Sequence, residues 1–148
     1  MRFRRDMSRN GIVGTEPTTR VWVNGTFDVL HAGHIYLLQR ARNIAPNTHV
    51  CVGIDSDERV AQLKGDGRPI NPSTDRMEFL RAIRFVDSVQ VFRSDNDLIN
   101  QIRTYNPHVM VIGEDYLNKP IIGQEYIELI HYVPRYKGLS STKILNNQ

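Results

Sequence analysis

The sequence predicts an α/β fold, and three observations support this prediction. Short apolar runs alternate with segments of helical periodicity along most of the 148 residues. A turn marked by Gly25 joins the first apolar run to the first helical segment. The hydrophobic content of 40% is enough for one compact core. We therefore expect a Rossmann-like α/β/α sandwich with a mainly parallel sheet, in which ligands bind beyond the carboxyl ends of the strands.

The first strand is predicted at residues 20–24, where β-branched and aromatic side chains dominate. Apolar residues recur at helical spacing from Gly33 onward, which predicts the first helix. Pro72 precedes a second clear helical segment, and Ser73 is its expected cap. The further strands are expected at residues 49–55, 89–92, 109–112 and 128–133, and the further helices at 73–85, at 96–105 and, as a short final helix, from Ser140.

Composition limits the classes of partner and location. Residues 1–19 mix charge, glycine and proline without periodicity, so we expect a poorly ordered extension before one domain at residues 20–148. The net charge of +3 is small, and much of it lies in that extension, so no nucleic-acid partner is expected. No apolar run approaches the roughly 20 residues that span a bilayer. These features predict a soluble, cytoplasmic protein without a membrane partner, and the single Cys51 is expected to be a buried thiol.

Residues 23–34 carry the most informative motif. His31 and His34 fall at the predicted first turn of the first helix, where unpaired backbone N–H groups and the helix dipole favour an anion. Two imidazoles can add hydrogen-bond donors there, and Gly33 allows a ligand to approach the backbone closely. The pattern favours a phosphate site. The simpler alternative, a pair of histidines that only cap the helix or bind a metal, is weakened because no CxxC or HExxH pattern supplies further zinc ligands.

Three blocks of sequence resemble known families. The segment from Thr26 to His34, with Thr-Phe-Asp followed by His-Ala-Gly-His, resembles the signature of the cytidylyltransferase-like nucleotidylyltransferases. Residues 63–72, 75–76 and 83–87 resemble the middle of heptose 1-phosphate adenylyltransferases. Residues 135–144 resemble the end of glycerol-3-phosphate cytidylyltransferases. Together these resemblances cover the chain from Val21 to its C-terminus.

The resemblance implies roles for particular residues. The implied catalytic residues are His31, His34, Lys64 and Arg84. The implied nucleotide-binding residues are Gly25, Thr26, Phe27, Asp28, Gly33, Glu114, Asp115, Arg135, Ser140, Ser141 and Thr142. The implied acceptor-binding residues are Arg68 and Arg76. The resemblance also implies a homodimer, and a Mg²⁺ ion that arrives on the nucleoside triphosphate rather than in a protein cage.

The expected reaction is the in-line attack of an acceptor phosphate on the α-phosphorus of a nucleoside triphosphate, with release of pyrophosphate. The two ends of the chain favour CTP and a small polyol phosphate such as glycerol 3-phosphate. The middle block favours the alternative, ATP and heptose 1-phosphate. A non-catalytic nucleotide-binding module is a second alternative. Simpler interpretations also exist for the loop at residues 64–68, as a solvated surface loop, and for residues 140–142, as ordinary helix caps.

Overall fold

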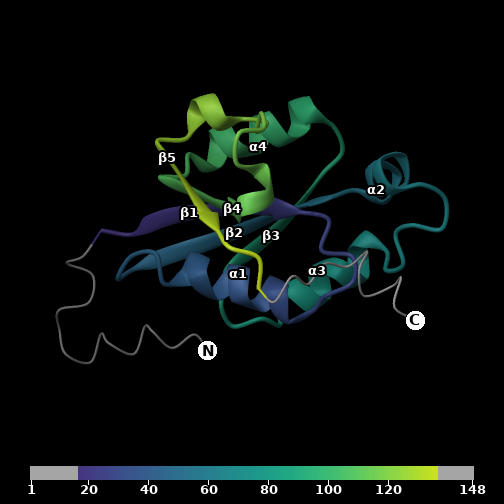
Figure 1. The fold of residues 1–148 in the computed structure, drawn as a ribbon, viewed down its shortest axis with the longest axis horizontal. Helices are drawn as coiled ribbons and strands as arrows, with labels where there is room; N and C mark the ends of the chain where they lie inside the picture. The colour runs from purple at the N-terminus through teal and green to yellow at the C-terminus, as the bar shows by residue number, and fades with distance from the viewer. Residues whose placement is uncertain (1–16, 137–148) are drawn as a thin grey trace.

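The computed structural model describes residues 17–136, which form a five-stranded sheet flanked by helices (Figure 1). All four neighbouring strand pairs are parallel, in the order β3-β2-β1-β4-β5. The predicted α/β fold is therefore confirmed. The strands are β1 (Thr19–Gly25), β2 (Thr48–Asp55), β3 (Ser88–Phe92), β4 (Val109–Gly113) and β5 (Leu129–Val133). The helices are α1 (Ala32–Arg42), α2 (Asp57–Lys64), α3 (Ser73–Arg81) and α4 (Asp95–Tyr105), with short 3-10 turns at Glu114–Tyr116 and Gln124–Tyr126.

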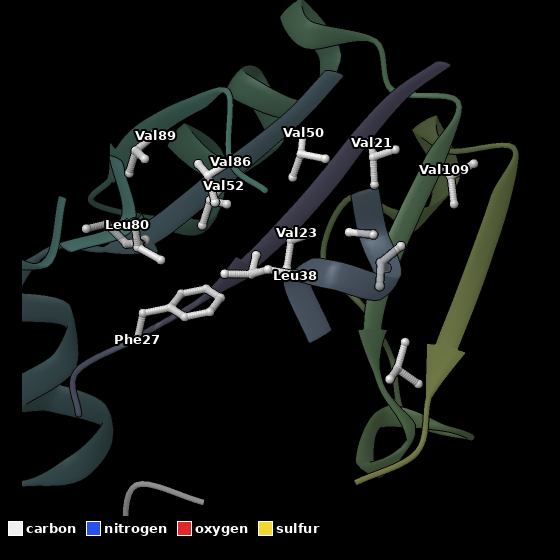
Figure 2. Packing of buried hydrophobic residues seen from close by; sticks show 14 residues of the cluster. Val21, Val23, Phe27, Leu38, Val50, Val52, Leu80, Val86, Val89 and Val109 are labelled. Carbon is white, nitrogen blue, oxygen red and sulfur yellow. The ribbon is translucent and has the colours of Figure 1, made fainter. Parts of the chain in front are cut away.

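Helices cover both faces of the sheet, and strand alternation decides which side chains meet them. Figure 1 shows α1 and α3 on one face and α4 on the other. Val21 and Val23 of β1 pack on the first face with Leu38 of α1 and Leu80 of α3, as Figure 2 shows. Trp22 points to the opposite face, because successive strand residues alternate. It packs there in a second cluster with residues of α4.

Most element boundaries lie within one or two residues of their predicted positions, but α3 differs. It ends at Arg81 rather than at residue 85, because the apolar side chains of Ile83 and Phe85 pack against the core from the turn that follows the helix. The predicted cap is also wrong: Pro72 occupies the cap position, without a side-chain hydrogen bond, and Ser73 is already helical. Cys51 is buried, as expected. The final helix predicted from Ser140 lies outside the described residues.

The order in which the chain adds strands to the sheet reverses between β1 and β4, although all strands stay parallel. It proceeds from β1 outward through β2 to β3, and then crosses back to add β4 and β5 on the other side. Such a switch point opens a crevice at the carboxyl ends of the strands. The ladder between β1 and β4 is short, with Val21↔Val109 and Trp22↔Met110, whereas the β1–β2 ladder continues to Gly25↔Ile54. Within residues 17–136, no helix is long and apolar enough to cross a membrane.

Candidate active site

A cavity of about 270 Å³ opens at the switch point, and most of the predicted site residues line it. It lies beyond the carboxyl ends of β1, β4 and β5, next to the N-terminus of α1. The predicted residues on its wall are Gly25, Thr26, Phe27, His31, Gly33, His34, Lys64, Glu114, Asp115 and Arg135. Residues of the sequence that are separated by more than a hundred positions therefore converge on one site. Ser140, Ser141 and Thr142 lie outside the described residues.

The two histidines form a capping box at the start of α1. His31 is the cap residue, and its Nδ1 accepts a hydrogen bond from the backbone N–H of Gly33 at 3.0 Å. The Nδ1 of His34 accepts a hydrogen bond from the backbone N–H of His31 at 3.2 Å. This arrangement resembles the usual Ser/Thr and Glu/Gln capping box, with imidazole nitrogens as the acceptors. The imidazole rings lie with their centroids 3.9 Å apart, and Phe27 packs against His34.

These two hydrogen bonds determine which ring nitrogen of each histidine remains for a ligand. An acceptor Nδ1 in a neutral imidazole leaves the proton on Nε2. Each histidine therefore presents an Nε2–H donor on the side away from the helix backbone. The Nε2 atom of His31 is buried and has no hydrogen-bond partner among the described residues. A buried donor without a partner is costly, so this atom is suited to an anionic ligand.

The environment of the two histidines keeps them neutral. Burial, followed by electrostatic interactions with His31 and Lys64, lowers the pKa of His34 to about 3, well below the usual value of an imidazole. Burial, followed by the charge of Arg135, also lowers the pKa of His31. At neutral pH both imidazoles therefore act as neutral hydrogen-bond donors rather than as cations. Among the described residues of the cavity wall, Lys64 and Arg135 supply the positive charge.

The lowered pKa of His34 predicts a loss of stability in acid. Between about pH 6.5 and pH 3 the unfolded chain binds a proton at this residue and the folded protein does not, so acidification favours unfolding. Replacing His34 by glutamine removes this difference while preserving a residue that suits the third position of a capping box. We expect the melting temperature to fall less between pH 7 and pH 5 in His34→Gln than in the unchanged protein. Equal falls would contradict the lowered pKa.

Asp28 lies behind the cavity wall rather than on it. Its side chain is fully buried and accepts hydrogen bonds from the backbone N–H groups of Ile70 and Asn71, at 2.8 and 2.9 Å, and from Nε of Arg68 at 2.8 Å. Burial alone raises its pKa, but these hydrogen bonds outweigh burial and lower it. Neither Asp28 nor Arg68 lines the cavity in this structure, so the predicted nucleotide contact of Asp28 and acceptor contact of Arg68 stay predictions. In this structure the two residues anchor the loop that follows Lys64.

Arg76, predicted to bind the acceptor, makes structural contacts in this structure. Its side chain has no exposed surface. The guanidinium donates to the backbone oxygens of Asn71, Thr26 and Asp55 at 2.8–2.9 Å, and to the carboxylate of Asp57 at 2.7 Å. The residue thus joins the turn after β1, the end of β2 and the loop before α3. Arg76 does not line the cavity.

Arg84 lies at the wrong edge of the sheet for the catalytic role that the resemblance implies. It follows α3 and precedes β3, so it sits near the amino ends of the strands, whereas the cavity lies at their carboxyl ends. Its exposed side chain lies over the ring of Phe85, 5.1 Å from the centroid. The order of the predicted elements already carried this information, because a residue just before a parallel strand cannot lie at that strand's carboxyl end.

We therefore expect Arg84→Ala to leave turnover nearly unchanged. The kcat and the KM for the triphosphate should stay within about twofold of the unchanged protein, since surface substitutions away from a site have small effects. Steady-state kinetics of pyrophosphate release measures both constants. A fall in kcat of tenfold or more would contradict this expectation and would assign Arg84 a catalytic role through a contact that the structure does not show.

Acidic residues hold Arg135 at the mouth of the cavity. The backbone N–H of Arg135 donates to a carboxylate oxygen of Glu114 at 3.1 Å, and its guanidinium forms an ion pair with Asp115. These contacts connect the turn after β4 to the segment after β5. The Arg135 side chain is 41% exposed, so the ion pair can be exchanged for a ligand phosphate at little cost.

Sequence reasoning missed several residues of the cavity wall. Asn24 lies one residue before the end of β1 and half-buried Tyr36 lies on α1, and neither was given a role in the site from the sequence. Tyr36 stacks with Tyr136 at a centroid distance of 5.2 Å. The position of Asn24 directly before Gly25 was an available signal, because the last residues of a central parallel strand lie at the ligand edge. No such signal in the sequence pairs Tyr36 with a residue a hundred positions away.

Within residues 17–136, no group of three or more histidine, cysteine, aspartate or glutamate side chains could hold a metal ion. The two carboxylates on the cavity wall, Glu114 and Asp115, are both in contact with Arg135. This donor set does not resemble a protein cage for Mg²⁺, which prefers several oxygen ligands.

The fold and the site together define a class: a parallel α/β domain whose cavity adjoins the N-terminus of a histidine-capped helix, a position suited to phosphate in nucleotide-binding enzymes. A model of the family described as cytidylyltransferase-like matches residues 22–147. The chain therefore belongs to the cytidylyltransferase-like family, and it is a nucleotidyltransferase enzyme domain.

Known relatives add detail to this assignment. The bifunctional protein HldE of Campylobacter fetus subsp. fetus (strain 82-40) is 42% identical over 128 residues, which are 86% of this chain and 27% of that protein. The bifunctional protein HldE of Campylobacter concisus (strain 13826) is 40% identical over 125 residues, covering 84% of this chain and 26% of that protein. The chain thus spans about a quarter of the length of these curated relatives.

A solved structure supports the fold independently. The crystal structure of the lipopolysaccharide core biosynthesis protein from Thermoplasma volcanium GSS1 superposes with a TM-score of 0.64 at 19% sequence identity. The match covers 80% of this chain and 98% of that chain. At this identity the likeness establishes the architecture alone.

Proposed function

We propose that this domain transfers an adenylyl group from ATP to a heptose 1-phosphate and releases pyrophosphate. The similarity to the HldE proteins, at about 40% identity, supports this reaction over the transfer of CMP to glycerol 3-phosphate that the sequence analysis favoured. The resemblance of residues 63–72 to heptose 1-phosphate adenylyltransferases supports the same choice. The preference for CTP rested on residues 25–28 and on the block at residues 135–144, and most of the second block lies outside the described residues.

The pair of Nε2–H donors on His31 and His34 is the observation that carries the proposal. Phosphoryl groups in such a transfer need positioned donors and positive charge, because the transition state spreads charge over the phosphate oxygens. The two imidazoles supply donors that are already held in place by the capping box. Lys64 and Arg135, which both line the cavity, supply the charge that draws the triphosphate and the leaving pyrophosphate.

A Mg²⁺ ion carried by the triphosphate completes the proposal. Such an ion neutralises the phosphate oxygens and orients the leaving group. The cavity wall suits a metal that arrives with its substrate, because both of its carboxylates are held by Arg135. Chelation of the metal is therefore expected to stop turnover without unfolding the protein.

A panel of nucleotides and acceptors tests the proposed function. ATP, CTP, GTP and UTP are each combined with heptose 1-phosphate and with glycerol 3-phosphate, and pyrophosphate release is measured. Release is expected to be fastest with ATP and heptose 1-phosphate. A fastest rate with CTP and glycerol 3-phosphate would instead support the cytidylyl reaction. Nucleotide binding without release in any combination would support a non-catalytic module. Light scattering of the same sample tests the homodimer that the family resemblance implies.

A further inference from the structure

Trp22 holds the side-chain amide of Asn24 in one orientation at the end of β1. The two residues are two positions apart on the strand, so their side chains lie on the same face of the sheet. The indole Nε1 of Trp22, whose side chain is fully buried, donates a hydrogen bond to Oδ1 of Asn24 at 2.9 Å. Since an indole nitrogen only donates, its partner has to be the amide oxygen. The Nδ2 group of Asn24 therefore points away from Trp22.

Packing around Trp22 keeps this arrangement rigid. A Cβ atom at Gly53, the partner of Asn24 in the neighbouring strand, would lie 2.6 Å from Cζ2 of Trp22. The indole thus occupies the space that any other residue at position 53 would need for its side chain. Trp22 also packs with Phe92 and with Leu98 of α4. A side chain confined in this way acts as a positioning residue for the amide beside it.

The Nδ2 group is available to a ligand. Asn24 is half-buried and lines the cavity, beyond the last paired residues of the β1–β4 ladder. Among the described residues, the indole is the only group that hydrogen-bonds to its side chain. Two N–H donors therefore remain, held in a fixed direction before any substrate binds. Preorganised donors of this kind contribute to specificity because a ligand that lacks the matching acceptor leaves them unpaired.

We propose that Asn24 is a specificity-determining residue whose amide donates to a hydroxyl oxygen of the sugar phosphate acceptor. The proposal rests on the proposed function. The charged and imidazole donors, namely His31, His34, Lys64 and Arg135, are suited to the triphosphate. The amide is a neutral donor whose own oxygen is already bonded to Trp22, so it matches a neutral oxygen. A sugar acceptor presents several such oxygens.

Two variants separate loss of the donor from other effects. Asn24→Asp keeps an oxygen for the indole N–H but removes the donor and adds a charge. Asn24→Leu removes the donor without a charge and leaves the indole unpaired. An effect common to both variants therefore reports the donor. We expect each variant to raise the KM for the acceptor about three- to tenfold, as for the loss of one neutral hydrogen bond, with the KM for ATP within about twofold. Thermal unfolding identifies any variant that fails to fold.

Monodeoxy analogues of the acceptor provide the second measurement. Removal of the hydroxyl that Asn24 contacts should lower kcat/KM for the unchanged protein and have no effect on Asn24→Leu. Trp22→Phe retains the donor but releases the amide, and a smaller rise in the acceptor KM is expected. A rise confined to the KM for ATP would overturn the proposal and assign the amide to the nucleotide, and unchanged constants in both Asn24 variants would also overturn it. Failure of the proposed function is a different result, namely no pyrophosphate release by the unchanged protein.

Discussion

Replacement of Arg76 by methionine is expected to lower the free energy of unfolding by about 3–5 kcal/mol. The guanidinium is fully buried and donates hydrogen bonds to backbone oxygens of three separate segments. It also forms an ion pair with Asp57. Methionine has similar length but no donor, so the backbone oxygens of Thr26, Asn71 and Asp55 lose their hydrogen-bond partner at a fully buried side chain. Each such loss costs about 1–3 kcal/mol. Urea denaturation followed by circular dichroism measures the change.

Arg81→Met is the matched control for this prediction. Arg81 lies on the same helix, its side chain is 54% exposed, and its contact with Glu78 is a weak one at 3.7 Å. The same chemical change there is expected to alter the free energy of unfolding by about 0.5 kcal/mol or less. If both variants unfolded at the same urea concentration as the unchanged protein, Arg76 would not be a structural residue, and the acceptor contact would have to be considered again.

His34→Ala is expected to lower kcat by about 10²–10³-fold, the usual consequence of removing one preorganised donor to a developing charge. The KM for the triphosphate should change by only a few-fold, because the donor acts mainly as charge moves in the transition state. His34 is neutral at neutral pH, because its pKa is about 3. Protonation of His34 should therefore not cause a fall in kcat/KM near pH 6.5 when the free enzyme is acidified.

Gln39→Ala on the same helix controls for effects on α1, because Gln39 is exposed and does not line the cavity. Its kinetic constants should match those of the unchanged protein. The melting temperature of His34→Ala shows how much of any loss comes from the missing capping contact with His31. A folded His34→Ala protein with kcat within a few-fold of the unchanged protein would remove this imidazole from the mechanism.

Local patterns in the sequence were sufficient for the architecture. Alternating apolar runs predicted the five strands of the sheet, and the turn at Gly25 placed His31 and His34 at the start of α1. These predictions succeeded because each depends on neighbours in the sequence, namely strand alternation, helical periodicity and a cap. The end of α3 was misplaced for the opposite reason. Ile83 and Phe85 continue an apolar pattern while the backbone has already left the helix to reach β3.

The roles of individual polar residues depended on contacts between distant segments. No residue near Arg76 in the sequence indicates that its guanidinium donates a hydrogen bond to the backbone oxygen of Thr26, fifty positions earlier. The same holds for Asp28, whose partners lie more than forty positions away. A family resemblance transfers residue types along a sequence, but it does not say whether a charge faces the ligand or the scaffold. Asn24 was overlooked because its importance arises from the direction in which Trp22 turns its amide.

The ladder between β1 and β4 is short, and the cavity lies where these two strands no longer pair. Its wall therefore combines residues from the first and the second half of the chain. Its lining comes from residues between 24 and 37, from Lys64, and from residues 112–116 and 133–136. β1 and β4 do not pair next to the cavity. A substrate that contacts both strands is therefore expected to add contacts between them. A ligand at a hundred times its dissociation constant adds about 2.7 kcal/mol to the folded state. Substrate binding is thus expected to raise the melting temperature of the protein as well as to start the reaction.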